Sequence, residues 1–194
     1  AELAGVLGGR TAVLCTSRKA VERVAQAVKH SLDAWCDALG HAPIHVLSQL
    51  EHGRTAMLGH FRNNPRAVLV GAAALWEGLD LPGNLLNAVI IDKIPFAQPD
   101  DPVLAARLKA CETAGLSPFD TLQIPEACLA LKQGTGRLIR SEGDVGVLVV
   151  CDPRLVQMGY GRRLIASLPT MPILRTTDSW REWLGLLRGI SSRL

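Results

Sequence analysis

The chain has 194 residues, of which 48% are hydrophobic and 20% charged, and its formal net charge is +3 at pH 7. This composition excludes an intrinsically disordered chain, and the length predicts a single domain over residues 1–194. The charge alone is too small to indicate a nucleic-acid partner. No run of about 18 uncharged apolar residues is present, so no membrane partner is expected.

Cysteine and histidine spacing predicts neither disulfides nor a metal site. No two of the five cysteines have Cys-x-x-Cys spacing, and the five histidines form no His-x-His or His-Glu-x-x-His pattern. An odd number of scattered cysteines indicates buried, reduced thiols in a cytosolic protein. The segment Ala1-Glu2-Leu3 lacks a basic region followed by an apolar stretch, so no signal peptide is expected.

The first half of the chain alternates predicted strands and helices. Thr11–Cys15 is a short apolar run that is typical of a strand. Apolar residues spaced three or four apart over Arg18–Leu39 indicate an amphipathic helix, which Gly40 ends. The elements predicted next are a strand at Pro43–Leu47, a helix at Arg54–Phe61, and strands at Ala67–Val70 and Ala88–Ile91.

The second half continues this alternation, with a strand expected at Val145–Val150 and a late strand at Ile173–Leu174. Strands that are apolar on both faces are typical of a parallel sheet with helices on each side, so the fold class is α/β. Such sheets bind ligands at the carboxyl ends of their strands. The predicted helices are Asp101–Ala114, Pro125–Arg140, Arg154–Leu168 and Ser179–Leu187.

A cluster of polar residues lies near the end of the predicted helix Pro125–Arg140. At about 100° per residue, Gln133, Arg137 and Arg140 would project from one face, with Leu131 and Leu138 toward the core. Two guanidinium groups on one ridge suit the negative charge of a phosphoryl-transfer transition state, as arginine fingers do. A solvated basic face explains the same spacing.

Two further segments follow predicted strands. Trp76-Glu77-Gly78-Leu79-Asp80-Leu81-Pro82-Gly83 places two carboxylates where a ribose hydroxyl can bind, although Leu-Pro-Gly-Asn is also ordinary turn chemistry. Cys15-Thr16-Ser17-Arg18-Lys19 joins a strand to a helix amino terminus. Its hydroxyls and cations suit a phosphate, but a plain helix cap accounts for Thr16 and Ser17 equally well.

Other parts of a nucleotide hydrolase are absent from the sequence. No Gly-Lys dipeptide occurs, so there is no Gly-x-x-x-x-Gly-Lys-Ser/Thr phosphate loop, and no Asp-Glu-x-His or Asp-Glu-x-Asp run supplies a magnesium ligand. Gly-x-Gly-x-x-Gly is also missing after every predicted strand, which disfavours a small-molecule enzyme of the doubly wound type.

Taken in order, the motifs resemble the second RecA-like motor domain of superfamily 2 helicases of the DinG/XPD type, and the bacterial DinG branch in particular. Leu14-Cys15-Thr16-Ser17 resembles motif IV, Trp76 to Gly83 motif V, and Leu131 to Arg140 motif VI. The family's other matching segments are Lys93-Ile94-Pro95-Phe96, Pro99-Asp100-Asp101-Pro102, Asp152-Pro153-Arg154 and Tyr160-Gly161-Arg162.

The resemblance implies roles for individual residues. Arg137 and Arg140 would be catalytic and would reach the γ-phosphate of ATP. The residues expected to line the nucleotide cleft are Gln133, Gly136, Glu77, Gly78 and Asp80. The residues expected to contact single-stranded DNA are Thr16, Ser17, Arg18, Trp76 and Lys93.

The resemblance also implies a RecA-like three-layer α/β/α sandwich with a mainly parallel sheet, in an ATP-dependent helicase that moves 5′ to 3′ on DNA. ATP and Mg²⁺ would be shared with the first RecA-like motor domain of the same protein. That other half would carry the phosphate loop, the magnesium carboxylate and an iron–sulphur cluster. The expected location is the bacterial cytoplasm, in association with the nucleoid.

The alternative from another class is a non-enzymatic regulatory module that binds a nucleotide or a nucleic acid on the same scaffold. Fold alone does not separate a module of this kind from a motor domain, because function depends on the site that a fold carries.

Overall fold

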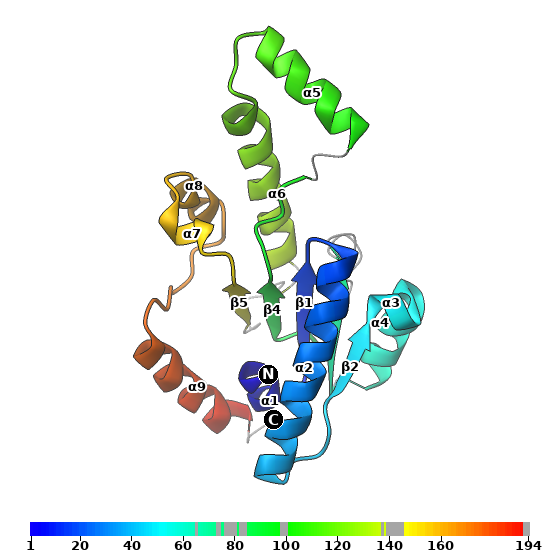
Figure 1. Ribbon diagram of the computed structural model, residues 1–194. Coiled ribbons are helices and arrows are strands. Elements are labelled where there is room, and N and C mark those ends of the chain that lie inside the picture. Colours follow the sequence, from blue (N-terminus) through cyan, green and yellow to red (C-terminus); the bar gives the residue numbers. More distant parts are fainter. Residues whose placement is uncertain are drawn as a thin grey trace.

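The computed structural model describes residues 1–64, 66–72, 75, 81, 85–97, 101–136, 138 and 146–191. Its centre is a sheet of five parallel strands in the order β2-β3-β1-β4-β5 (Figure 1). The predicted parallel α/β fold is therefore confirmed. The strands are β1 (Thr11–Cys15), β2 (His45–Ser48), β3 (Ala67–Ala72), β4 (Ala88–Ile91) and β5 (Val147–Val150).

Helices cover both faces of the sheet and make three layers. Alternate residues of a strand point to opposite faces, so Leu14 of β1 belongs to an apolar cluster that includes residues of α4, α6 and α8, whereas Val13 belongs to a cluster with residues of α1 and α2. A third apolar cluster joins α9 and α1 to β4 and β5. The helices are α1 (Glu2–Val6), α2 (Arg18–Leu39), α3 (Gln49–His52), α4 (Arg54–Asn63), α5 (Pro102–Thr113), α6 (Ile124–Thr135), α7 (Arg154–Gln157), α8 (Gly161–Ala166) and α9 (Thr177–Ser191).

Helix α2 has the bounds that its apolar spacing predicts. The Ser17 hydroxyl accepts a hydrogen bond from the Ala20 N–H at 3.2 Å and caps the amino terminus. Gly40 ends the helix with φ +64°, a left-handed conformation that glycine adopts without steric cost. The buried stripe of α2 faces β1 and β3. Helix α2 begins at Arg18, shortly after β1 ends at Cys15, so its amino terminus lies at the carboxyl edge of the sheet.

The largest differences between the predicted elements and the structure are as follows. Ile173–Leu174 is not a strand, and both residues are about half exposed. The predicted helix Arg154–Leu168 is divided into α7 and α8, because Met158 has an extended backbone. Helix α6 ends at Thr135 and not at Arg140. Within the part of the chain that the structure describes, no helix is long and apolar enough to cross a membrane.

Candidate nucleotide and nucleic-acid surfaces

The central strands β1 and β4 create a switch point at the carboxyl edge of the sheet. They pair side by side, with Leu14 level with Ile91. The connection after β1 leads to β2 on one side, whereas the connection after β4 leads to β5 on the other side. Parallel sheets bind ligands in the crevice where neighbouring connections diverge in this way. The segments that follow Cys15 and Ile91 therefore form the first candidate surface.

Thr16, Ser17 and Arg18 lie on this edge, between β1 and α2. Thr16 and Ser17 are half-buried, and Arg18 is exposed. Because Ser17 caps α2, its hydroxyl has a structural partner in the helix backbone. The capping explanation for Ser17 is thus confirmed, and contact of these residues with DNA stays a prediction.

Lys93 lies on the same edge, after β4, and is exposed. The backbone N–H groups of the residues on either side of it both donate hydrogen bonds. The Asp92 N–H donates to the Leu14 carbonyl oxygen at 3.0 Å, and the Ile94 N–H donates to Oδ2 of Asp152 at 3.0 Å. Lys93 therefore follows β4 at the edge of the sheet where β1 also ends, and its contact with DNA stays a prediction.

Asp152 is a buried carboxylate directly after β5, with 5% of its surface exposed. Arg154 binds it through Nε at 2.9 and 3.0 Å and through Nη2 at 2.6 Å, and the Arg154 N–H also donates to Oδ1 at 3.0 Å. These hydrogen bonds, above all those from the Arg154 side chain, lower the pKa of Asp152 to about 2. The segment Asp152-Pro153-Arg154 resembles the family, but its sequence alone does not indicate this buried pair.

An aromatic cluster joins the same loops to α8. The rings of Phe96, Phe119 and Tyr160 lie 5.1 to 5.8 Å apart, and the Arg154 guanidinium carbon lies 5.5 Å from the centre of the Phe96 ring. Segments that resemble the family at 93–96, 152–154 and 160–162 therefore meet in one place. Because these segments are far apart in the sequence, their contact could not be predicted from local spacing.

The second candidate surface is the end of α6, where Gln133 and Gly136 are exposed. Leu131 and Leu138 are buried as predicted. Helix α6 is shorter than predicted, because it ends at Thr135 with Gly136 as its carboxyl cap, and the single face expected for Gln133 and both arginines stays a prediction. Arg137 and Arg140 lie outside the described residues.

Motif V also lies mostly outside the described residues, which include none of Trp76, Glu77, Gly78 and Asp80. The strand that leads to it is well defined. Gln49 Oε1 accepts a hydrogen bond from the Ala72 N–H at 2.8 Å, and a Cβ on Gly71 would lie 2.8 Å from the same oxygen. Gln49 thus fixes the end of β3, a role that no local sequence pattern indicates.

The cysteines differ from the prediction of five buried thiols. Cys15 and Cys36 are buried, Cys111 and Cys128 are partly exposed, and Cys151 is exposed. Burial, with the nearby charges of Asp92 and Cys151, raises the pKa of Cys15 to about 12. Cys15 is therefore a protonated core residue at the carboxyl edge and has no properties of a nucleophile.

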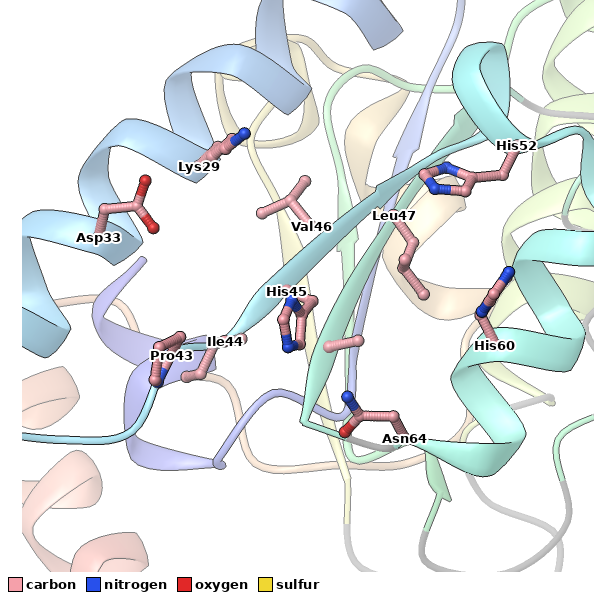
Figure 2. A pocket seen from close by; sticks show the side chains of 11 residues that line it. Lys29, Asp33, Pro43, Ile44, His45, Val46, Leu47, His52, His60 and Asn64 are labelled. Atoms are coloured by element: carbon pink, nitrogen blue, oxygen red, sulfur yellow. The ribbon is translucent and has the colours of Figure 1, made fainter.

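Histidines gather away from both candidate surfaces, around a surface cavity of about 390 Å³ at the outer strand β2 (Figure 2). Lys29 and Asp33 of α2 lie on one side of β2, and His52 and His60 lie on the other. Among the described residues no group of three or more His, Cys, Asp or Glu side chains is arranged to hold a metal ion. None of the predicted site residues lines this cavity.

The geometry is that of a RecA-like α/β domain: a parallel sheet between helices, with cations at its switch point. In agreement, a solved XPD helicase matches with a TM-score of 0.54 over 84% of this chain and 28% of that chain, at 19% identity. The chain belongs to the family described as "Helicase C-terminal domain", whose model matches residues 1–171. It is the helicase C-terminal domain of the DinG/XPD/YoaA type.

Two curated relatives are similar over most of this chain. The ATP-dependent DNA helicase YoaA of Escherichia coli K12 is 43% identical over 170 residues, which are 88% of this chain and 25% of YoaA. The ATP-dependent helicase DinG of Mycobacterium tuberculosis (strain ATCC 25177 / H37Ra) is 37% identical over 92% of this chain and 25% of its own length. The chain thus spans about a quarter of these relatives.

Proposed function

We propose that this chain is the second motor domain of an ATP-dependent DNA helicase of the DinG type. The observation that carries the proposal is the family match over residues 1–171, together with relatives that are named ATP-dependent helicases. The whole protein would move 5′ to 3′ on single-stranded DNA. Opening and closing of the cleft between two motor domains would convert nucleotide state into stepping.

In this proposal ATP and Mg²⁺ bind mainly to the first RecA-like motor domain, because this sequence has no phosphate loop. Arg137 and Arg140 act as arginine fingers on the γ-phosphate. The exposed end of α6 supports this role, because Gln133 and Gly136 lie there, directly before Arg137. The remaining residues proposed for the nucleotide cleft are Glu77, Gly78 and Asp80. An iron–sulphur cluster would belong to the other half of the protein.

The carboxyl edge of the sheet would carry the DNA. Arg18 and Lys93 supply exposed cations at the ends of neighbouring strands, and the amino terminus of α2 adds backbone N–H groups. Thr16, Ser17 and Trp76 complete the proposed track. Separate surfaces for nucleotide and DNA suit a motor that couples the two ligands.

The bounds and location of the domain are also proposals. We infer that residues 1–194 form one domain, since α9 packs on α1 beyond the end of the family match. Action in the bacterial cytoplasm on nucleoid DNA follows from the proposed helicase function.

The test is Arg137→Ala in the full-length protein. Loss of an arginine finger reduces turnover by about 10³-fold or more while ATP binding stays nearly intact. Arg23→Ala, which removes an exposed arginine of α2, is the matched control and should leave turnover unchanged. Normal turnover of the Arg137→Ala protein would remove Arg137 from the mechanism.

A further inference from the structure

We propose that Asp152 is a positioning residue, which holds Lys93 in place for DNA through the backbone of Ile94. The inference rests on the proposed function, because the role of Lys93 in DNA binding is part of that proposal. Asp152 itself is buried and would not touch DNA.

The two residues come from adjacent strands of the sheet. Asp152 follows β5 and Ile94 follows β4, and the Cys151 N–H donates to the Ile91 carbonyl oxygen at 2.8 Å where these strands end. The carboxylate then reaches across and accepts the hydrogen bond from the Ile94 N–H at 3.0 Å. This hydrogen bond joins the segment after β4 to the segment after β5, beyond the last paired residues of the two strands.

This attachment acts directly on Lys93. The Ile94 N–H belongs to the planar peptide group that also contains the Lys93 carbonyl, so its hydrogen bond orients the backbone of Lys93. On the other side, the Asp92 N–H is bonded to Leu14. The Ile94 side chain is 2% exposed and packs in the same core cluster as Leu131 and Leu138. Lys93 is the exposed residue between two fixed neighbours.

Arg154 keeps the carboxylate oriented. Its guanidinium forms a bidentate pair with Asp152, and 44% of the Arg154 side chain stays exposed. The ion pair is only partly buried, and apolar residues of similar volume in its place would stabilise the fold about as well. Its position beside a loop that resembles a family motif therefore points to orientation of the loop.

The test is a double-mutant cycle in the full-length protein, with oligo(dT) as the probe. Lys93→Ala and Asp152→Ala are each expected to raise the Kd for oligo(dT) by about 5- to 10-fold, the scale of one lost charged contact. The double variant is expected to be no weaker than Lys93→Ala, because both changes remove the same contact. Independent, multiplying effects would overturn the positioning role.

Two further variants distinguish a loss of fold stability from the loss of the positioning contact. Leu32→Ala opens a cavity on the other face of the sheet and destabilises the fold, yet should leave the Kd for oligo(dT) unchanged. Asp152→Asn retains an oxygen for the Ile94 N–H but loses the ion pair, so it should bind oligo(dT) more tightly than Asp152→Ala. Equal weakening by Leu32→Ala, or no recovery in Asp152→Asn, contradicts the inference.

The wild-type protein separates this inference from the proposed function. Wild-type protein that binds oligo(dT) and hydrolyses ATP faster in its presence supports the proposed function, and the cycle then decides the role of Asp152. Wild-type protein that does neither overturns both. In the Asp152→Ala variant the KM for ATP should change less than twofold, since the contact that is lost serves the DNA surface.

Discussion

Oε1 of Gln49 accepts a hydrogen bond from the backbone N–H of Ala72 at 2.8 Å, and this bond joins the first residue of α3 to the last residue of β3. Gln49→Ala leaves that N–H without its partner, so the free energy of unfolding should fall by about 1 to 2 kcal/mol. Urea denaturation of the chain measures the change. The control Gln26→Ala, at an exposed position of α2, should stay within about 0.5 kcal/mol of wild type. Equal stability of both variants would contradict a structural role for Gln49.

Asp152 should make stability depend on acid pH. Its pKa of about 2 lies below the ordinary value of 3.8, so the folded state favours the carboxylate. The resulting stabilisation, on the order of 2 kcal/mol, is complete above about pH 4 and is lost as the pH falls through about 2. Between pH 7 and pH 2, wild type should therefore lose more unfolding free energy than Asp152→Asn. Asp178→Asn, whose side chain is 96% exposed in wild type, should follow the wild-type profile.

Gly161 is packed too closely to accept a side chain. A Cβ at this position would overlap the backbone carbonyl of Leu155. Gly161→Ala should lower the free energy of unfolding by about 2 to 3 kcal/mol, because backbone has to move. Gly159→Ala is the control, since a Cβ there meets nothing within 4 Å. Thermal unfolding of the two variants should differ clearly, and similar midpoints would refute the packing argument.

The chain alone should have no measurable ATPase activity. A nucleotide hydrolase needs a phosphate cradle and a metal site, and the sequence contains neither motif. Phosphate release from the purified chain, with and without oligo(dT), measures this. Robust turnover that a substitution within residues 1–194 abolishes would overturn the proposed division of labour between two domains.

Local sequence patterns predicted much of the fold, because the buried faces of its strands and of α2 consist of regularly spaced apolar residues. The bounds of β1, β4 and α2 agree with the sequence, since apolar runs and caps specify each one. Strand β2 begins at His45 and not at Pro43, because pairing starts with the hydrogen bond from the His45 N–H to Arg66. Proline has no N–H with which to pair in this way.

The two main failures have different causes. Ile173 and Leu174 have strand-like composition but are 52% and 41% exposed, and no strand lies beside them in the described part of the chain. Helix α6 stops early at a glycine, where the Thr135 hydroxyl also donates to the Leu131 carbonyl oxygen. Local propensity therefore revealed neither the absence of a strand at Ile173–Leu174 nor the end of α6 at Thr135.

The candidate surfaces were predictable only in part. Sequence order placed Ser17 and Lys93 after strands, and parallel pairing brings strand ends to one edge. The contact between Asp152 and Ile94 depends on the pairing of β4 with β5, which local spacing does not specify. The same holds for Gln49, whose partner lies 23 residues away.

The two terminal helices have a practical consequence for anyone who shortens this protein. Trp180 and Trp183 stack at 5.6 Å and, with Leu184, cover Leu3 and Val6 of α1. A version trimmed at residue 171, where the family match stops, would leave those aliphatic side chains facing water. Such a truncation should be prone to self-association, even though all the motif segments that resemble the helicase family lie before residue 171.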